Sequence, residues 1–312
     1  MLKISLKKFR EDYPQYSNIK DEWFEWFIGF SEADGSFIVT RREDCEFVIS
    51  QYEPNIGVLE EIKEVFGFGS VIIQSKRLDR SVHKGKGAKE AVYRWIVRDV
   101  RSLRVVISLF NNGNLVLPIK KARFKDFCSK FVVKLDRVLK NKPGKFGPKG
   151  TNPVKEIIIN IPEGDTFFSK EDGWLSGFTD GDGSFSLSFL SNSIDFRLRY
   201  CIGASIHSSK YKESTKYVID HIKREFFNGV GSSRLESKKG GKDFYEYRIN
   251  GVKNCNLVYE YFDTFSLKCS SKLAMYLLHK IMREKIVVKD HLDTKKRNEM
   301  IVLWKTISTY KH

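Results

Sequence analysis

Hydrophobic and small residues recur every three or four positions in two similar stretches of the chain, residues 26–37 and 174–185. In each stretch a tryptophan, a glycine, a phenylalanine and a second small residue share one side of a helix, so the pattern predicts two helices. Each helix should end at a glycine, Gly35 or Gly183, the residue type that commonly closes helices. Apolar and polar residues alternate beyond each glycine, so we expect each helix to lead directly into a strand.

The two stretches form an internal repeat, because a constant 182 − 34 = 148 residues separates their seven identical positions. Small residues stand four apart in both copies, at Gly29 and Ala33 and at Gly177 and Gly181. This spacing leaves a flat side on each helix, along which a second backbone can approach closely. We therefore predict that the two helices pack on each other and form the interface between two half-domains.

The same order of elements follows each repeat. The first half predicts strands at 46–51, 70–76 and 91–97, a loop at 77–89, and helices at 58–66, 100–110 and 119–139. The second half predicts strands at 195–206, 231–238 and 244–250, a helix at 217–227, and further helices up to the C-terminus. A stretch rich in proline, glycine and lysine predicts a linker over residues 141–165, between halves 1–140 and 166–312. The pattern is typical of an α+β fold.

Each predicted helix carries an aspartate in its last turn, Asp34 or Asp182, where the helix dipole disfavours negative charge. Packing of the helices would bring the two carboxylates together, which is costly for like charges. Divalent cations between them, with phosphate oxygens completing the coordination, would make the arrangement favourable. The alternative, an acid that caps its own turn, suits Glu32 and Asp180 better. A calcium loop starting at Asp180 is excluded by its spacing, since its sixth residue is phenylalanine instead of glycine.

The charge of the chain indicates what kind of partner it binds. Its 312 residues carry a formal net charge of +16, which favours a polyanion, and nucleic acid above all. Ribosomal and membrane-surface proteins share this property, so charge alone leaves them open. No apolar run reaches the length needed to cross a bilayer, and we expect no membrane partner.

The two repeats resemble the LAGLIDADG motif of homing endonucleases, and the chain resembles a single-chain member with two motifs. The resemblance implies a pseudo-two-fold α+β fold in which each half has a saddle-shaped antiparallel sheet along the DNA. It also implies that the last acidic residue of each motif, here Asp34 and Asp182, binds Mg²⁺ or Mn²⁺. Ca²⁺ would then support binding without cleavage. What the residue before the first aspartate, Ala33, contributes is left open.

A nuclease of this type needs a cation near the scissile phosphate. Lys120 and Lys268 lie 268 − 120 = 148 residues apart, which equals the spacing of the motifs. Both resemble the family's active-site lysine, although each could be a solvated surface charge. Lys121 is the alternative in the first half.

A polar residue at the end of the second strand completes the expected site. Gln51 resembles the family position that helps to order water around the metals. In the second half the alignment puts Ile206 there, with His207 next, so the counterpart of Gln51 stays open.

One face of each sheet is expected to read DNA. Arg197 and Arg199 alternate with apolar residues, as a strand needs when one face lies on DNA and the other on a core. A β-ribbon fits the major groove, where arginine pairs with guanine. The candidate DNA-binding residues are Gln74, Lys76, Arg94, Arg197, Arg199, Arg234, Lys238 and Arg248. Each could instead be a solvated polar or charged residue.

The resemblance implies a site-specific endonuclease that cuts both strands of a long asymmetric double-stranded DNA site, leaves short 3′ overhangs and acts as a monomer. Two alternatives stay open, a maturase that binds its host intron RNA and a DNA-binding protein that has lost catalysis. The two intact aspartates favour the nuclease. Richness in lysine, phenylalanine and isoleucine suggests an AT-rich genome, and the family's frequent place in organellar introns suggests the mitochondrial matrix.

Overall fold

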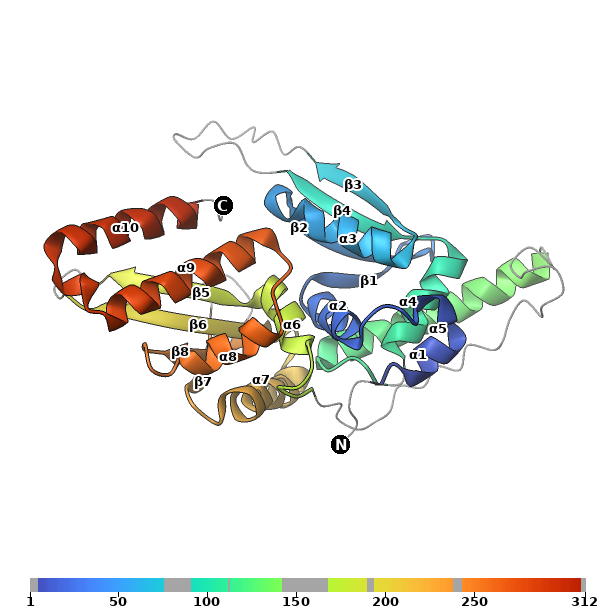
Figure 1. Cartoon of the computed structure of the whole chain (residues 1–312). Helices are drawn as coiled ribbons and strands as arrows, with labels where there is room; N and C mark the ends of the chain where they lie inside the picture. Colours follow the sequence, from blue (N-terminus) through green and yellow to red (C-terminus); the bar gives the residue numbers. More distant parts are fainter. Residues whose placement is uncertain are drawn as a thin grey trace, which may run out of the picture.

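A computed structural model describes residues 5–75, 91–111, 113–141, 168–189, 194–237 and 243–309. The first half contains α1 (Lys7–Asp12), η1 (Pro14–Tyr16), α2 (Asp21–Asp34), β1 (Gly35–Val39), β2 (Cys45–Tyr52), η2 (Glu53–Asn55), α3 (Ile56–Phe66), β3 (Ser70–Ser75), β4 (Val92–Val97), α4 (Val100–Phe110) and α5 (Pro118–Asn141). The second half contains α6 (Trp174–Asp182), β5 (Ser184–Phe189), β6 (Phe196–Ser205), η3 (Ser209–Tyr211), α7 (Lys212–Phe227), β7 (Ser232–Glu236), β8 (Phe244–Asn250), α8 (Asn256–Thr264), α9 (Ser270–Val287), η4 (Asp290–Leu292) and α10 (Thr294–Thr309). The two halves flank the central pair α2 and α6 (Figure 1).

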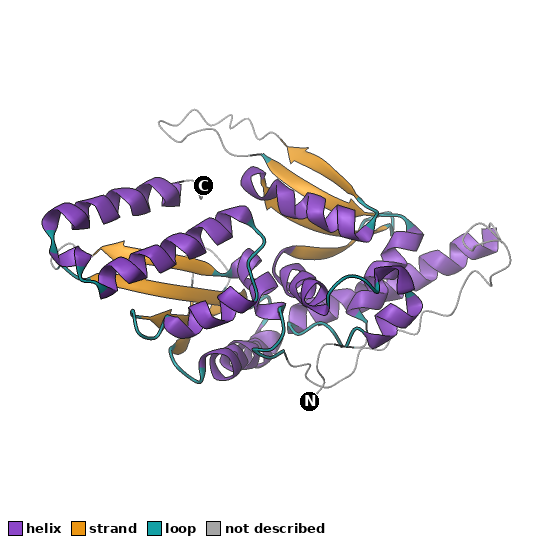
Figure 2. Cartoon of the chain, viewed as in Figure 1, coloured by secondary structure: helices purple, strands orange, loops and turns teal. Residues whose placement is uncertain are grey.

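Each half builds its sheet in the same way. The strand orders are β1-β2-β4-β3 and β5-β6-β8-β7, and all neighbouring strands are antiparallel. Figure 2 shows the two sheets on either side of the central helices, with further helices packed against them. The predicted order of helix, two strands, helix, two strands and helices is confirmed in both halves, as is the α+β class. The short helices α1 and η1 were not predicted from the sequence.

The interface between the halves is the close contact of α2 with α6. A Cβ added to Gly29 would lie 1.9 Å from the carbonyl oxygen of Trp174, and one added to Gly177 would lie 1.8 Å from that of Trp26. These approaches are equivalent under the pseudo-two-fold symmetry. They confirm that the small residues let the two backbones touch.

The glycines that end these helices serve a different purpose from the one that the sequence suggested. Gly35 and Gly183 have φ values of −72° and −81°, in the extended region instead of the left-handed one of a typical closing glycine. A Cβ on Gly35 would lie 2.5 Å from the oxygen of Ser31, and one on Gly183 would lie 2.5 Å from Thr179 Cγ2. Lack of space therefore requires glycine where each helix turns into its strand.

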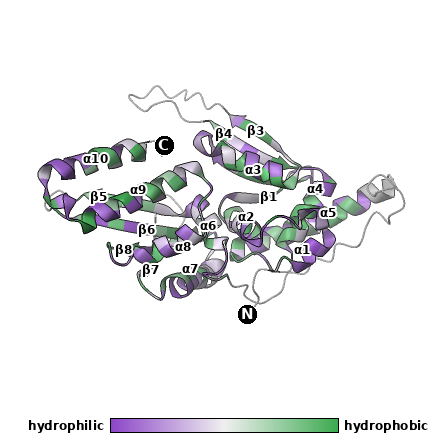
Figure 3. Cartoon of the chain, viewed as in Figure 1, coloured by the Kyte–Doolittle hydropathy of each residue, from purple (hydrophilic) through white to green (hydrophobic). Residues whose placement is uncertain are grey.

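Each sheet has one apolar face and one more polar face. Along β6, Leu198, Tyr200 and Ile202 are buried, while Arg197 is exposed and Arg199 is half-buried. Both apolar and polar residues occur along the helices, such as α3 and α9 (Figure 3). The core is rich in aromatic side chains, among them Phe47, Phe110, Phe185 and Tyr247. The buried faces and the helices thus form the core, which leaves the opposite faces of the sheets available for a partner.

Some predictions fall on parts of the chain that the structure does not describe. The predicted loop 77–89 and almost all of the linker 141–165 lie outside the described residues, so the division into 1–140, 141–165 and 166–312 stays a prediction. Lys76 and Lys238 also lie outside them. None of the helices in the described segments is both long and apolar enough to cross a bilayer.

Candidate active site

The two central helices each end on an aspartate, Asp34 in α2 and Asp182 in α6. Asp34 Oδ2 lies 3.1 Å from the point that a Cβ on Gly181 would occupy, so Asp34 abuts the last turn of the opposite helix. Burial, and after it the charge on Asp182, raises the pKa of Asp34 to about 7. The two carboxylates therefore meet at one end of the helix pair, which we call the shared end.

Gln51, near the end of β2, is buried beside Asp34. Its Nε2 donates a hydrogen bond to Asp34 Oδ2 at 2.5 Å. This bond favours the ionised carboxylate, so it lowers the pKa of Asp34 against the effect of burial. Gln51 Oε1 accepts a hydrogen bond from Asn55 Nδ2 at 3.2 Å, which holds the amide with its donor toward Asp34.

Glu32 and Asp180, two residues before the aspartates, point away from the shared end. Glu32 accepts hydrogen bonds from the backbone N–H groups of residues 116–117, and Asp180 accepts them from those of residues 268–269. Burial raises the pKa of Glu32 to about 7 and that of Asp180 to about 6. The sequence suggested that each caps its own turn. Instead, each holds the segment that leads into a helix whose first turn carries a buried or half-buried lysine.

The first of these lysines is Lys120, in the first turn of α5. It is buried, and its Nζ donates hydrogen bonds to the carbonyl oxygens of Ser31 at 3.3 Å, Ala33 at 3.4 Å and Gly35. The carbonyls of Ser31 and Ala33 belong to the last turn of α2, and that of Gly35 follows it directly. This is the negative end of the helix dipole, where a cation is favourable. Burial lowers the pKa of Lys120, whereas Glu32 and both aspartates of the shared end raise it.

Lys268 is engaged elsewhere. Its Nζ donates a hydrogen bond to Glu61 Oε1 on α3 at 2.7 Å and lies 5.4 Å from the centroid of the Trp26 ring. Lys272, one turn further along and inside α9, takes the place equivalent to that of Lys120, because its Nζ donates to the carbonyl oxygen of Gly183. Burial lowers the pKa of Lys272, and Asp180, Cys269 and both aspartates of the shared end raise it.

The segment between the central helix and the lysine-bearing helix is longer in the second half than in the first. For this reason a spacing of 148 residues from Lys120 did not identify the equivalent lysine. The aspartates are 182 − 34 = 148 residues apart, but the backbone partners of Glu32 and Asp180 are 268 − 116 = 152 residues apart. The two lysines that contact the helix ends are also 272 − 120 = 152 residues apart. A signal was present in the sequence, since Lys120 and Lys272 each precede an alanine by two residues. Lys121, the alternative in the first half, is half-buried and acts electrostatically on Glu32.

The register of the sheets identifies the counterpart of Gln51. Gly35 is opposite Ile49 in the first sheet, and the pairing of Ser184 with Cys201 places Gly183 opposite Ile202 in the second. Ala204, two residues beyond Ile202, thus corresponds to Gln51. It is buried and apolar. Ile206 and His207, which the sequence alignment placed here, lie beyond the end of β6.

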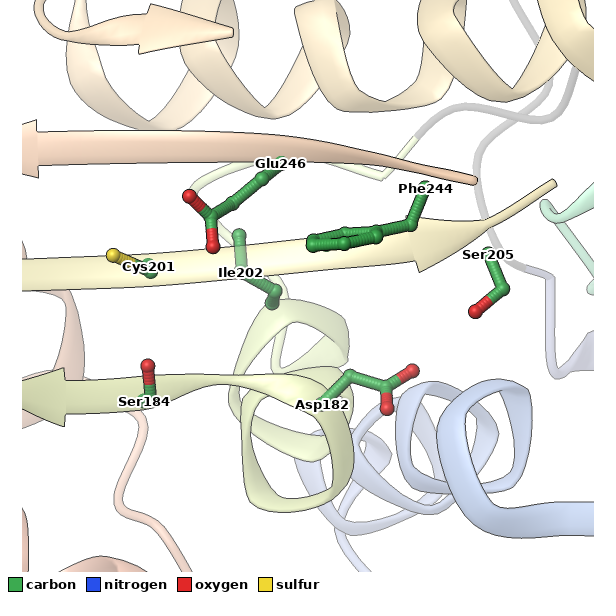
Figure 4. Close-up of a pocket in the computed structure, with 8 residues that line it drawn as sticks. Asp182, Ser184, Cys201, Ile202, Ser205, Phe244 and Glu246 are labelled. Atoms are coloured by element: carbon green, nitrogen blue, oxygen red, sulfur yellow. The ribbon is translucent and has the colours of Figure 1, made fainter. Parts of the chain in front are cut away.

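Asp182 borders a cavity of about 460 Å³ over the outer face of the second sheet (Figure 4). The other lining residues are Ser184, Cys201, Ile202, Gly203, Ser205, Phe244 and Glu246. In Figure 4 the Asp182 side chain projects from the end of its helix toward the side of the cavity that holds Ser205. Arg197 and Arg199 are on the same face of β6 as Cys201 and Ser205, because alternate residues of a strand share a face. The aspartate and the arginine-bearing face are therefore continuous.

The remaining candidate DNA-binding residues lie on the sheets in different environments. Gln74 is exposed in β3, and Arg94 is half-buried in β4 opposite Ser50. In the second sheet Arg248 pairs with Glu246 and, at 3.6 Å, with Glu236, which lies 3.4 Å from Arg234. These acidic partners were not predicted from the sequence, and they reduce the positive charge that the two arginines present.

The donors at the shared end fit a hard divalent cation. Asp34 and Asp182 supply carboxylate oxygens, and the charge on Asp182 is one of the causes that raise the pKa of Asp34, as expected for two carboxylates held close together. Among the described residues no three histidine, cysteine, aspartate or glutamate side chains gather as a metal cluster. A Mg²⁺ or Mn²⁺ ion bound here would therefore take its other ligands from backbone carbonyls, water or a phosphate.

Comparison with known families gives a match to both halves. The model of the family described as LAGLIDADG endonuclease matches residues 27–131 and 175–282. The first segment includes the second half of α2, the first sheet and the first part of α5. The second includes all but the first residue of α6, the second sheet and most of α9.

Two curated proteins are similar over most of this chain. "Probable intron-encoded endonuclease 4" of Neurospora crassa is 31% identical over 282 residues, which cover 88% of this chain and 42% of that protein. "Probable intron-encoded endonuclease aI2" of Debaryomyces hansenii is 24% identical over 278 residues, covering 78% of this chain and 34% of that protein. The chain thus spans less than half the length of these relatives.

Solved structures share the fold over nearly the whole chain. The meganuclease I-SmaMI bound to uncleaveable DNA superposes with a TM-score of 0.62 at 17% identity, covering 90% of this chain and 95% of that one. The meganuclease I-AabMI bound to uncleaved DNA has a TM-score of 0.62 at 17% identity, covering 91% and 97%. At such identities the likeness shows the fold, and it agrees with the duplicated α+β arrangement.

Proposed function

This chain belongs to the LAGLIDADG endonuclease family, and from that premise we propose that it is a site-specific homing endonuclease. It would hydrolyse one phosphodiester in each strand of a long asymmetric DNA site and leave short 3′ overhangs. The observation that carries the proposal is the meeting of Asp34 and Asp182 at the shared end, where Lys120 and Lys272 each contact the end of one central helix. Two acids and two lysines that are withdrawn from the surface, Lys120 buried and Lys272 half-buried, suit the cleavage of two phosphodiesters better than DNA binding alone.

Each side chain at the shared end would have a separate role in hydrolysis. Asp34 and Asp182 would hold Mg²⁺ or Mn²⁺, which when bound lowers the pKa of water and polarises the phosphate. Lys120 and Lys272 would stabilise the negative charge that develops on the phosphates. Gln51 orients Asp34 and favours its ionised form against the effect of burial. Ca²⁺ is expected to bind at the same oxygens and to support DNA binding without cleavage.

Lys268 remains a candidate only by its spacing from Lys120, because its contact with Glu61 directs the ammonium group away from the carbonyl that Lys272 contacts. We therefore assign the second cation of the site to Lys272.

Double-stranded DNA would lie along the outer faces of the two sheets. Arg197 and Arg199 share their face with the cavity beside Asp182, and the formal net charge of +16 supports binding to phosphates. I-SmaMI and I-AabMI, which share the fold, were solved with bound DNA, and this supports DNA as the partner. Because the two halves differ in sequence, a single chain acting as a monomer would recognise an asymmetric site.

The two alternatives are an intron RNA maturase and a DNA-binding protein without catalysis. The intact pair of aspartates, with Lys120 and Lys272 beside it, favours the nuclease over both, since RNA or DNA binding alone gives no reason to bring these groups together. We propose a mitochondrial matrix location for an organelle-encoded protein, which the similarity to intron-encoded endonucleases supports.

The decisive experiment is selection of cleaved sites from a randomised duplex library in Mg²⁺. We expect a single long site to be enriched, with cuts in both strands. The same duplex should bind in Ca²⁺ and stay intact. Enrichment of bound but uncut duplexes in Mg²⁺ would contradict the proposal and favour the non-catalytic protein, and preference for an intron RNA would favour the maturase.

A further inference from the structure

Asn55 is a buried residue of the first half whose side chain faces the second half. It is the last residue of η2 and directly precedes α3, yet its side chain does not cap α3. Its Oδ1 instead accepts hydrogen bonds from Ser271 N at 3.1 Å and from Ser270 Oγ at 3.3 Å. These serines are the first two residues of α9.

Asn55 thereby completes a helix of the other half. The first N–H groups of a helix have no partner within the helix, and asparagine is among the residue types that best supply one. Cys269, which precedes α9, makes no side-chain cap. Asn55 Oδ1 accepts the N–H of the second residue of α9, as a capping side chain normally does. The next residue is Lys272, so Asn55 holds the turn that carries the second lysine.

The other end of the same amide reaches the first aspartate. Asn55 Nδ2 donates to Gln51 Oε1 at 3.2 Å, and Gln51 Nε2 donates to Asp34 Oδ2 at 2.5 Å. An amide has one accepting and one donating end. Asn55 Oδ1 is hydrogen-bonded to α9, so Asn55 Nδ2 is the group that faces Gln51. Gln51 must therefore accept with Oε1, which directs Gln51 Nε2 toward Asp34.

We propose that Asn55 is a positioning residue that aligns the two halves of the active site, holding Gln51 against Asp34 and the first turn of α9 with Lys272. This inference rests on the proposed nuclease function. The chain of amides belongs to one half only. Ala204 stands in the second half where Gln51 stands in the first, and Tyr211 is the residue that directly precedes α7, as Asn55 precedes α3.

Two substitutions separate the two contacts of Asn55. Asn55→Ala removes both the cap of α9 and the donor to Gln51. Asn55→Asp keeps an acceptor for Ser271 N but turns a second acceptor toward Gln51 Oε1, so it preserves the cap and breaks the link to Asp34. Glu61→Gln is the matched control, because Glu61 also joins the halves through Lys268 but makes no contact with Gln51 or Asn55 among the contacts described.

The measurements are single-turnover cleavage of each strand of the selected site in Mg²⁺, and the Kd for that site in Ca²⁺. We expect both Asn55 variants to cut each strand about tenfold or more slowly, because a small misplacement of catalytic groups has effects of that size. Their Kd should stay within about twofold of the parent value, since Asn55 lies inside the protein and away from the outer sheet faces. Glu61→Gln should keep the parental rate.

Each outcome bears on the inference separately from the proposed function. If Asn55→Asp cuts at the parental rate, or Glu61→Gln slows as much as Asn55→Ala, Asn55 does not link the two halves of the site. Loss of affinity equal to the loss of rate would make Asn55 a structural residue only. Failure of the parent protein to cut any duplex would instead overturn the proposed nuclease.

Discussion

Lys120 and Lys272 make the same contact in the two halves, each donating from Nζ to the carbonyl oxygen of the glycine that follows a central helix. Lys120 is buried and Lys272 is half-buried, and both stabilise the ionised form of Asp34. Lys120 and Lys272 are equivalent by their contacts and not by their spacing in the sequence. The two lysines are 272 − 120 = 152 residues apart, whereas the two aspartates are 148 residues apart.

Replacement of either lysine should slow cleavage without a comparable loss of binding. We expect Lys120→Met and Lys272→Met to lower the single-turnover rate by roughly 10²–10³, the usual loss for one oriented electrostatic contact in a transition state. Methionine keeps the volume of the buried side chain. Affinity should be measured in Ca²⁺ on the same duplex.

Lys268→Met is the control for this assignment, because the Lys268 side chain pairs with Glu61 on α3 and not with the end of a central helix. Its rate should stay close to that of the parent protein. If Lys268→Met cleaves slowly and Lys272→Met cleaves at the parental rate, the second active-site lysine is Lys268, as the spacing of 148 residues predicted, and the assignment of Lys272 is wrong.

The lysines also show what a single sequence can and cannot predict. The helix pair was predictable because Gly29 and Gly177 occupy equivalent places in a visible repeat, and small residues on a helix face have a direct steric meaning. The aspartates followed from the same helices. The position of Lys272 did not follow, because it depends on four extra residues, 152 − 148, in the chain between the motif and α9.

Other parts of the site depend on pairing across long distances in the sequence. Ala204 is the counterpart of Gln51 only through the strand register, which a one-residue shift in alignment would change. Asn55 carries no local signal, since its partners Gln51 and Ser271 come from different halves. The ion pair of Arg248 with Glu236 likewise arises from the neighbouring strand β7.

The close contact of the central helices predicts a large penalty for one added methyl group. Gly29→Ala and Gly177→Ala should each destabilise the metal-free protein by about 1–3 kcal/mol or more, because a Cβ would meet a backbone carbonyl that cannot move aside alone. Urea unfolding measures this change in free energy.

Gly57→Ala is the matched control, because Gly57 also lies in a helix but nothing lies within 4 Å of an added Cβ. It should leave stability unchanged or raise it by up to about 1 kcal/mol, since alanine favours helices over glycine. Equal effects of Gly29→Ala and Gly57→Ala would refute the close packing of α2 on α6.

The raised pKa of Asp34 predicts how stability depends on pH without metal. In the folded protein this pKa is about 7, whereas an aspartate in an unfolded chain titrates near 3.9. Between these values the folded state binds more protons than the unfolded state, so the free energy of unfolding falls as pH rises. The stabilising contribution is complete below about pH 4 and is lost as pH rises through about 7.

Asp34→Asn removes this titration. In EDTA, the free energy of unfolding of Asp34→Asn relative to the parent should therefore increase steadily from about pH 5 to pH 7.5. Asp44→Asn provides the comparison, because Lys134 lowers the pKa of Asp44 and its titration is complete below this range. A constant difference between Asp34→Asn and the parent across the range would show that Asp34 titrates normally.

The two acids of each central helix should respond in opposite ways to the loss of one charge. Asp34→Asn and Asp182→Asn remove a metal ligand, so cleavage should fall to near background. They also relieve repulsion at the negative ends of two helices, so metal-free Tm should stay level or rise. Specific DNA binding in Ca²⁺ should survive.

Asp180→Asn should instead lower Tm. Asp180 accepts hydrogen bonds from Trp26 Nε1, Lys268 N and Cys269 N, and an amide turns a donor toward at least one of them. A buried donor left without a partner costs about 1–3 kcal/mol. Cleavage, Tm and Kd in Ca²⁺ should be measured on all three variants. If Asp34→Asn loses Tm as Asp180→Asn does, Asp34 is a structural acid, and the metal site at the shared end must be abandoned.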